Sequence, residues 1–145
     1  IKKVIPVAMR LLDNVITLNF YPIKETKITA EKYRSVWLGF LWMAEYLAVN
    51  KLAYDTKEAR DVIDRLFEKY TYRTLKSSNE LAKERGTYKV YEWSEWSKWI
   101  LIWKDANWFE KNSDMSDKWL KLIKNIKKDG MRFAYHLAPA PNGST

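Results

Sequence analysis

A loop of Pro, Gly and hydroxyl residues closes the sequence: Pro141-Asn142-Gly143-Ser144-Thr145. The stretch before it, Met131 to Ala138, is short and apolar, which is typical of a buried strand. A strand that ends in such a loop presents backbone N–H groups and hydroxyls, and these donors bind phosphate oxygens. Gly143 also lets the backbone approach an oxyanion closely. The loop therefore predicts phosphate binding, and the alternative is an ordinary Pro-Asn-Gly turn.

Composition excludes several other chemistries. The chain has no Cys, which rules out disulfides, thiolate metal sites and a cysteine radical within it. Its one histidine, His136, argues against a histidine-based metal site or a catalytic triad. We therefore expect neither a metal ligand nor a catalytic residue among these 145 residues.

The net charge of +8 leaves several partners open: nucleic acid, an anionic membrane, a phosphorylated ligand, or one face of a larger assembly. No apolar run approaches the roughly 18–20 residues that cross a bilayer, and no signal peptide is visible. We expect a cytoplasmic protein without membrane contact. Because the chain starts at Ile1 and ends at Thr145 without a closing element, we also expect it to be a piece of something longer.

Apolar spacing predicts three helices. Spacings of three and four predict a helix from Val4 to Leu18, a longer one through Ala59 to Ala82 that ends at Gly86, and one from Ser116 to Gly130. Asp55 and Glu58 have the form of a capping box that opens the long helix, and Ser116 has the form of a cap. Ile23 to Thr29 is expected to be a polar connector.

Two further segments are harder to assign. Val36 to Ala44 is apolar all round, so it fits either a strand to Gly39 with a helix to Asn50, which Gly39 favours, or one buried helix. Residues Thr87 to Asn112 form a Trp-rich insertion, with a short helix expected from Ser94 to Trp103. Its tryptophans indicate buried packing more than a ligand platform: Trp93, Trp96, Trp99, Trp103 and Trp108.

The order helix, strand, helix, helix, helix, strand predicts an α/β architecture with parallel strands and helical crossovers. Two strands cannot make a sheet that buries itself, so the other strands should come from sequence outside this chain.

Three stretches together resemble the large, catalytic subunit of ribonucleotide reductase, and they occur in the same order and spacing. They are Leu11-Leu12-Asp13-Asn14-Val15-Ile16 with Asn19-Phe20-Tyr21-Pro22, then Ser78-Asn79-Glu80-Leu81-Ala82-Lys83-Glu84-Arg85-Gly86, then Gly130-Met131-Arg132 leading to Ala138-Pro139-Ala140-Pro141-Asn142-Gly143-Ser144.

The resemblance implies that residues 1–145 are a partial catalytic barrel domain: a mostly helical fragment of a ten-stranded α/β barrel that contributes about two parallel strands. The loop Pro141 to Thr145 would be the substrate diphosphate loop, with Ser144 and Thr145 at the two hydroxyl positions. Phe133-Ala134 and Asn142 depart from the usual family residues, and the radical cysteine and acid/base residues would lie outside this chain.

The predicted function is therefore reduction of ribonucleotides to deoxyribonucleotides by the assembled enzyme, with this chain inactive alone. The resemblance implies as partners the remaining portions of the large subunit, a radical-generating small subunit and a ribonucleoside di- or triphosphate. It implies no cofactor in this chain, although the whole enzyme needs a radical generator and a thiol reductant. The alternative is a basic, Trp-rich helical module that binds nucleic acid through Lys121, Lys124, Lys127 and Lys128.

Overall fold

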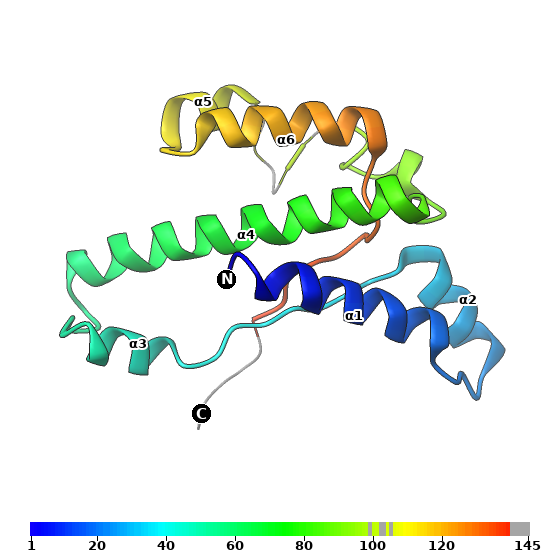
Figure 1. The fold of residues 1–145 in the computed structure, drawn as a ribbon, viewed down its shortest axis with the longest axis horizontal. Helices are drawn as coiled ribbons and strands as arrows, with labels where there is room; N and C mark the ends of the chain where they lie inside the picture. Colours follow the sequence, from blue (N-terminus) through cyan, green and yellow to red (C-terminus); the bar gives the residue numbers. More distant parts are fainter. Residues whose placement is uncertain (99, 102–103, 105, 140–145) are drawn as a thin grey trace.

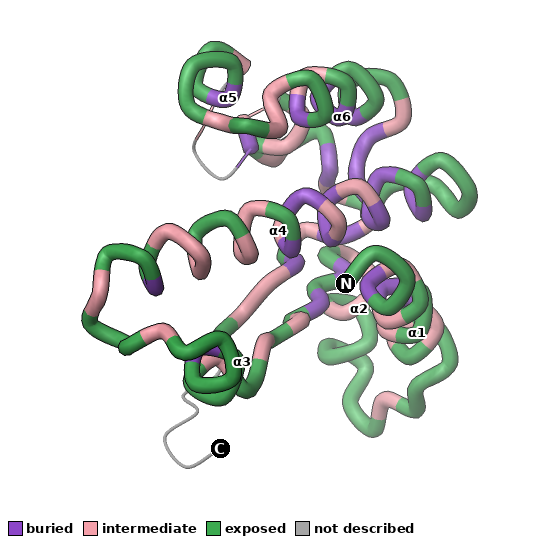
Figure 2. Tube along the Cα trace, turned by 60° about the vertical axis from the view of Figure 1, so that its left-hand side comes forward, coloured by how far each residue is buried: buried purple, intermediate pink, exposed green. Residues whose placement is uncertain are grey.

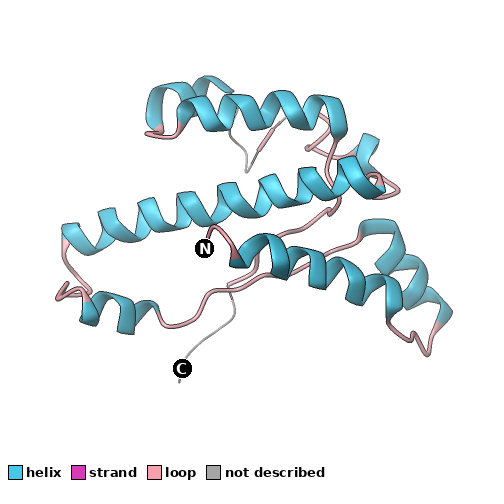
Figure 3. Ribbon diagram, in the orientation of Figure 1, coloured by secondary structure: helices cyan, strands magenta, loops and turns pink. Residues whose placement is uncertain are grey.

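The computed structural model describes residues 1–98, 100–101, 104 and 106–139, and it is mostly helical, as predicted (Figure 3). The long helix α4 crosses the molecule, with α1 on one side and α6, packed on α5, on the other (Figure 1). In chain order the helices are α1 Val4–Leu18, α2 Lys24–Tyr33, α3 Met43–Val49, α4 Lys57–Arg85, the 3-10 turn η1 Tyr91–Trp93, α5 Ala106–Asn112 and α6 Ser116–Asp129.

The ends of α4 are set by one side chain and one glycine. At the start, the hydroxyl of Thr56 accepts a hydrogen bond from the backbone N–H of Ala59 at 3.2 Å, so the predicted capping box at Asp55 is wrong. Asp and Thr are both good caps, and the apolar pattern does not decide which of two neighbours begins the helix. At the other end, Gly86 has φ +82° and donates to the Ala82 carbonyl, which confirms the predicted stop.

Helix α4 lies between two apolar cores, and its buried residues gather in its C-terminal half (Figure 2). The first core joins α1, α4 and two extended segments through Ile5, Met9, Val36, Tyr70, Leu81 and Phe133. The second joins α4, α5, α6 and the Trp-rich insertion through Tyr72, Leu75, Tyr88, Tyr91, Leu101, Phe109, Trp119, Leu122, Ile123, Ile126 and Met131. Burial on both faces explains how one helix organises the described chain.

Residues 35–41 and 131–138 are extended and run side by side in the same direction (Figure 1). A single parallel bridge joins Leu38 to Leu137, so neither segment forms the regular strand that the sequence predicted. An isolated pair of strands is marginal, and no third strand borders these two among the described residues. The segment then turns into α3 at Met43, as the interpretation of a break at Gly39 required.

A side chain at Gly39 would crowd the opposite segment. A Cβ there would lie 3.3 Å from the carbonyl oxygen of Ala138, closer than an ordinary van der Waals contact. Glycine therefore allows the two backbones to approach.

The expected connector at residues 23–29 is wrong, because α2 begins at Lys24. Helix α2 buries no residue, so it lacks the apolar stripe by which a helix is found in a sequence.

The expected helix from Ser94 to Trp103 is also wrong where the structure describes it: residues 94–98 form turns. The hydroxyls of Ser94 and Ser97 donate to nearby backbone carbonyls, which competes with helix formation. A helix does occur in the insertion, but later, as α5. Helix α6 begins at Ser116, whose predicted capping role is wrong because Met115 occupies the cap position and no side chain caps the helix.

The outward face of α1 is apolar. Its residues are between 50% and 82% exposed and recur every three or four positions, and we call them the α1 outer stripe: Val4, Val7, Leu11, Val15 and Leu18. A contiguous apolar surface of this kind marks an interaction site. None of the helices in the described ranges has the length and apolar character needed to cross a bilayer.

Candidate functional site

The predicted phosphate loop, Pro141, Asn142, Gly143, Ser144 and Thr145, lies outside the described residues. The structure does describe residues 130–138, the segment that leads into the loop. How firmly that segment is held determines how the loop is presented.

Helix α4 holds the start of the segment. The backbone N–H of Arg132 lies 3.3 Å from the Ser78 carbonyl and 3.2 Å from its hydroxyl oxygen, and donates to both. One residue along the helix, the side-chain amide of Asn79 donates to the Gly130 carbonyl at 2.9 Å. Gly130 has φ +70°, and a Cβ there would collide with Thr87, so the turn into the segment requires glycine.

The middle of the segment is held from two further directions. The Ala134 N–H donates to the Tyr33 carbonyl at 2.9 Å, and the indole N–H of Trp96 donates to the Ala134 carbonyl at 2.9 Å. Beyond it, Val36 donates to the Tyr135 carbonyl at 3.0 Å. The segment that leads into the loop is therefore fixed by four parts of the fold.

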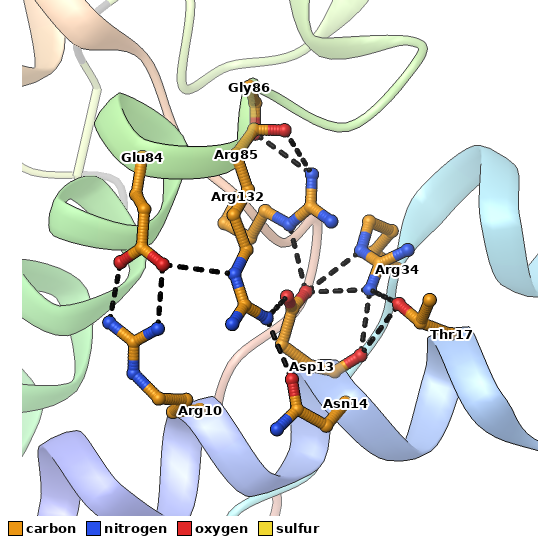
Figure 4. A network of polar contacts seen from close by, with 9 residues as sticks. All are labelled: Arg10, Asp13, Asn14, Thr17, Arg34, Glu84, Arg85, Gly86 and Arg132. Carbon is orange, nitrogen blue, oxygen red and sulfur yellow. Dashed lines mark hydrogen bonds and ion pairs between the residues drawn. The ribbon is translucent and has the colours of Figure 1, made fainter.

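A buried carboxylate with three arginines lies beside this segment (Figure 4). Asp13 on α1 is fully buried. Its Oδ1 accepts from Arg34 Nη2 at 2.7 Å and from Arg132 Nε at 2.8 Å, while its Oδ2 accepts from Arg85 Nη1 at 2.7 Å. We call these four residues the Asp13 hub. It ties together α1, the end of α2, the end of α4 and the segment before the loop.

The three guanidinium groups decide the charge state of Asp13. Burial by itself would raise the pKa of this carboxyl, but the hydrogen bonds from Arg132, Arg85 and Arg34 outweigh it and hold the pKa below its ordinary value. Asp13 in turn helps to hold Arg34 at φ +46°, a left-handed conformation that residues other than glycine rarely adopt. The hub therefore stabilises both a charge and a backbone turn.

The comparisons with known proteins agree with the resemblance seen in the sequence. The family described as ribonucleotide reductase, barrel domain, matches residues 1–145. The chain belongs to this ribonucleotide reductase family. It is 40% identical over 152 residues to the ribonucleoside-diphosphate reductase subunit alpha of Helicobacter pylori (strain ATCC 700392 / 26695), which covers 99% of this chain and 19% of that protein.

Two other relatives agree. The subunit alpha of Synechocystis sp. (strain ATCC 27184 / PCC 6803 / Kazusa) is 40% identical over 140 residues, covering 96% of this chain and 18% of that protein. The ribonucleoside-diphosphate reductase large subunit of Caenorhabditis elegans is 34% identical over 143 residues, covering 99% and 18%. The chain thus spans less than a fifth of the length of these curated relatives.

Within this ribonucleotide reductase segment, the three stretches that carry the family resemblance meet in space. Asp13 comes from the first stretch, Arg85 and Ser78 from the second, and Arg132 from the third. Sequence reasoning did not single out the hub, although its acid and two of its arginines lie in the stretches that identified the family. Charged residues shared by all three stretches were therefore the sequence signal that could have predicted the hub.

His136 is the chain's one histidine, and the structure gives it a packing role. It is buried, its Nε2 lies 2.8 Å from the Ser78 hydroxyl oxygen, and the Trp96 ring packs edge-on against it at 5.0 Å. Burial lowers the pKa of His136 to about 3, so the ring is neutral at pH 7. In the described ranges, no group of three or more His, Asp or Glu residues is placed to hold a metal ion.

Acidification from pH 7 to pH 5 should destabilise the ribonucleotide reductase segment. The unfolded chain takes up a proton at His136 near pH 6.5, whereas the folded chain does not until its pKa of about 3. The contribution of neutral His136 to the free energy of unfolding is therefore fully present above pH 6.5. Below that pH the free energy of unfolding falls by up to about 1.4 kcal/mol for each pH unit. Urea unfolding between pH 7 and 5 measures this slope.

His136→Gln is the matched variant, because its amide can still pair with Ser78. No other histidine titrates in this range. The variant should show a flatter dependence on pH. An equal slope in both proteins would mean that His136 takes up its proton in the folded chain as easily as in the unfolded one.

The tryptophans divide into two groups. Trp96 is half-buried against the second core, as predicted, but Trp93 is 90% exposed. Trp108 packs edge-on against Phe109, and the Lys104 ammonium lies over its ring at 3.4 Å. Trp99 and Trp103 lie outside the described residues. The packing interpretation is thus confirmed for Trp96 and wrong for Trp93.

Proposed function

We propose that this chain is part of the catalytic subunit of ribonucleotide reductase, and that it supplies scaffold and the substrate diphosphate loop, Pro141 to Thr145. The assembled enzyme would reduce ribonucleotides to deoxyribonucleotides by a protein-radical mechanism. The observation that carries the proposal is that residues 130–138, which lead into the loop, are held by four parts of the fold. A loop that follows a rigidly held segment can present its donors in one geometry. The family match over the whole chain supports it.

The same proposal assigns the two extended segments to a ten-stranded α/β barrel, to which the chain would contribute two parallel strands. Their parallel bridge at Leu38 and Leu137 supports this assignment. Among the described residues, each of the two extended segments has an unpaired edge, and each would become an interior strand once neighbouring strands pair with that edge. The remaining portions of the large subunit would supply those neighbours.

The α1 outer stripe supports the need for further protein, because five exposed apolar side chains on one helix face favour a packed neighbour. Other partners would be the radical-generating small subunit and a ribonucleoside di- or triphosphate. The radical generator and the thiol reductant would act through those other portions. A cytoplasmic location stays a prediction from the sequence.

The alternative of a nucleic-acid-binding module has no support from the three relatives reported above, which are named as ribonucleoside-diphosphate reductase subunits. Its lysines, Lys121, Lys124, Lys127 and Lys128, are exposed on α6 around a buried apolar stripe, as on any solvated helix.

Reconstitution tests the proposed function. The chain is mixed with the flanking portions of a matching large subunit, the complex is isolated by size exclusion with mass determination, and its reduction of ribonucleotides is assayed with the small subunit and reductant. We expect a complex that gains activity, and an inactive chain alone. A chain that stays monomeric in the presence of those portions and binds single-stranded nucleic acid would refute the proposal.

Replacing Ser144 and Thr145 with Ala in the reconstituted enzyme should raise KM about a hundredfold or more, because each of the two lost hydrogen bonds to a charged phosphate contributes roughly 1.5–3 kcal/mol. The kcat should change much less, since the loop binds the part of the substrate that does not react. Ser97→Ala, in the Trp-rich insertion, is the control and should leave both constants unchanged. Unaltered KM in the double variant would remove the loop assignment.

A further inference from the structure

A small polar cavity of about 210 Å³ opens beside the Asp13 hub, and nothing in the proposed function uses it. It is smaller than the 300–1,000 Å³ typical of sites for drug-sized ligands, so it suits an ion or a single side-chain group. Its lining is polar or charged throughout: Thr17, Glu31, Arg34, Thr87, Lys89 and Arg132.

Two guanidinium groups in this lining keep donors to spare. Arg34 uses Nε and Nη2 on Asp13 and Thr17, and Arg132 uses Nε on Asp13 and Nη1 on the carbonyls of Arg85 and Gly86. Within the described chain, Nη1 of Arg34 and Nη2 of Arg132 donate to no group, and Figure 4 draws both without a contact. Each such nitrogen carries two N–H donors.

The charges around the cavity do not balance. The ion pairs linked to it join three carboxylates, Asp13, Glu31 and Glu84, to six cations: Arg10, Lys27, Arg34, Arg85, Lys89 and Arg132. Six positive charges against three negative ones leave an excess of three positive charges. The side chains of Arg34 and Arg132 are only 9% and 12% exposed, so water screens this excess poorly.

We propose that this cavity is a binding site for a small oxyanion, held by the free guanidinium nitrogens of Arg34 and Arg132 with Lys89 at the rim. Guanidinium groups match the geometry of phosphate and carboxylate oxygens, and the charge-assisted hydrogen bonds they form are stronger than neutral ones. Glu31, which pairs with Lys89 at 3.2 Å, is the competing anion at the rim. The oxyanion has two possible sources: a free phosphate-type ion, or a carboxylate side chain from other portions of the large subunit.

Two rim variants should change the affinity in opposite directions. Inorganic phosphate is titrated into the chain by calorimetry, with chloride holding the ionic strength constant. Saturable binding of one phosphate per chain is expected. Lys89→Gln should weaken it and Glu31→Gln should strengthen it, each by roughly two- to fivefold, the scale of an exposed ion pair. Both side chains are at the surface, at 65% and 39% exposure, so the variants should fold, which circular dichroism checks.

A matched ion pair elsewhere supplies the control. Lys98 and Glu95 pair at 2.9 Å with similar exposure and lie outside this cavity, so Lys98→Gln and Glu95→Gln should leave phosphate binding unchanged. No saturable phosphate binding, or equal effects of all four variants, would overturn the proposal.

Repeating the titration on the reconstituted large subunit distinguishes the two sources. Retained binding assigns the site to a free oxyanion, whereas binding that is lost on reconstitution assigns it to a carboxylate from the added portions. These outcomes do not depend on enzyme activity, so the site can fail while the proposed function stands, and the reverse also holds.

Discussion

Asp13→Asn is expected to lower the free energy of unfolding by about 3–5 kcal/mol, the usual cost of removing one partner from a buried ion pair. The neutral amide would leave Arg34 and Arg132 without a counter-charge and Arg85 with Glu84 alone. It would also turn the charged oxygen that holds Arg34 in its left-handed conformation into a neutral, weaker acceptor. Such a loss is a large part of the 5–15 kcal/mol by which domains are stable. Urea unfolding followed by circular dichroism measures it.

Glu84→Gln is the matched control, because Glu84 also accepts from two arginines, Arg10 and Arg85, but at the surface. We expect a far smaller loss there, since solvent screens the pair. The low pKa of Asp13 adds a second criterion: the contribution of this carboxylate should persist above its ordinary value of 3.8 and disappear as the pH falls through its lower folded value. Equal losses in the two variants would contradict the assigned importance of the hub.

Trp119→Ala should destabilise the chain by about 3–5 kcal/mol, the range for truncating a buried aromatic side chain. Trp119 is 1% exposed, stacks on Phe109 with ring centroids 4.4 Å apart, and meets Tyr72 of α4 edge-on at 5.2 Å. It is therefore the main aromatic link between α6, α5 and α4. Urea unfolding gives the loss, and near-ultraviolet circular dichroism reports whether the aromatic packing persists.

Trp119→Phe separates packing from hydrogen bonding. Phenylalanine keeps a ring against Phe109 but loses the indole N–H that donates to Glu68 at 2.9 Å. We expect it to lose clearly less stability than the Ala variant. If the two substitutions cost the same, the bond to Glu68, rather than the stacked rings, would hold α6 in place.

The helices that could be predicted from the sequence are those with an apolar stripe. Spacing placed α1 and α4 closely, and both helices bury residues along one face. Helix α2 buries nothing, so the same reasoning found only a connector there. Hydrophobic periodicity detects burial, and only through burial does it detect helices.

The candidate site was predictable only in part, for a different reason. The loop at residues 141–145 could be proposed from residue types alone, because Gly and hydroxyl residues after a strand supply the N–H and O–H donors that bind phosphate. Asp13, by contrast, appeared as one polar residue of an amphipathic helix. Its partners lie 21, 72 and 119 residues away, and no local pattern encodes contacts at that distance.

Those separations also have a consequence for how the chain matures during synthesis. At the usual 5–20 residues per second, roughly 6–24 s pass between the addition of Asp13 and that of Arg132. During that interval the nascent helix carries a carboxylate that still lacks one of its three partners, and its opposite face is the apolar α1 outer stripe. Helix α1 therefore lacks its full set of ion pairs during that interval, while chaperones and proteases are present.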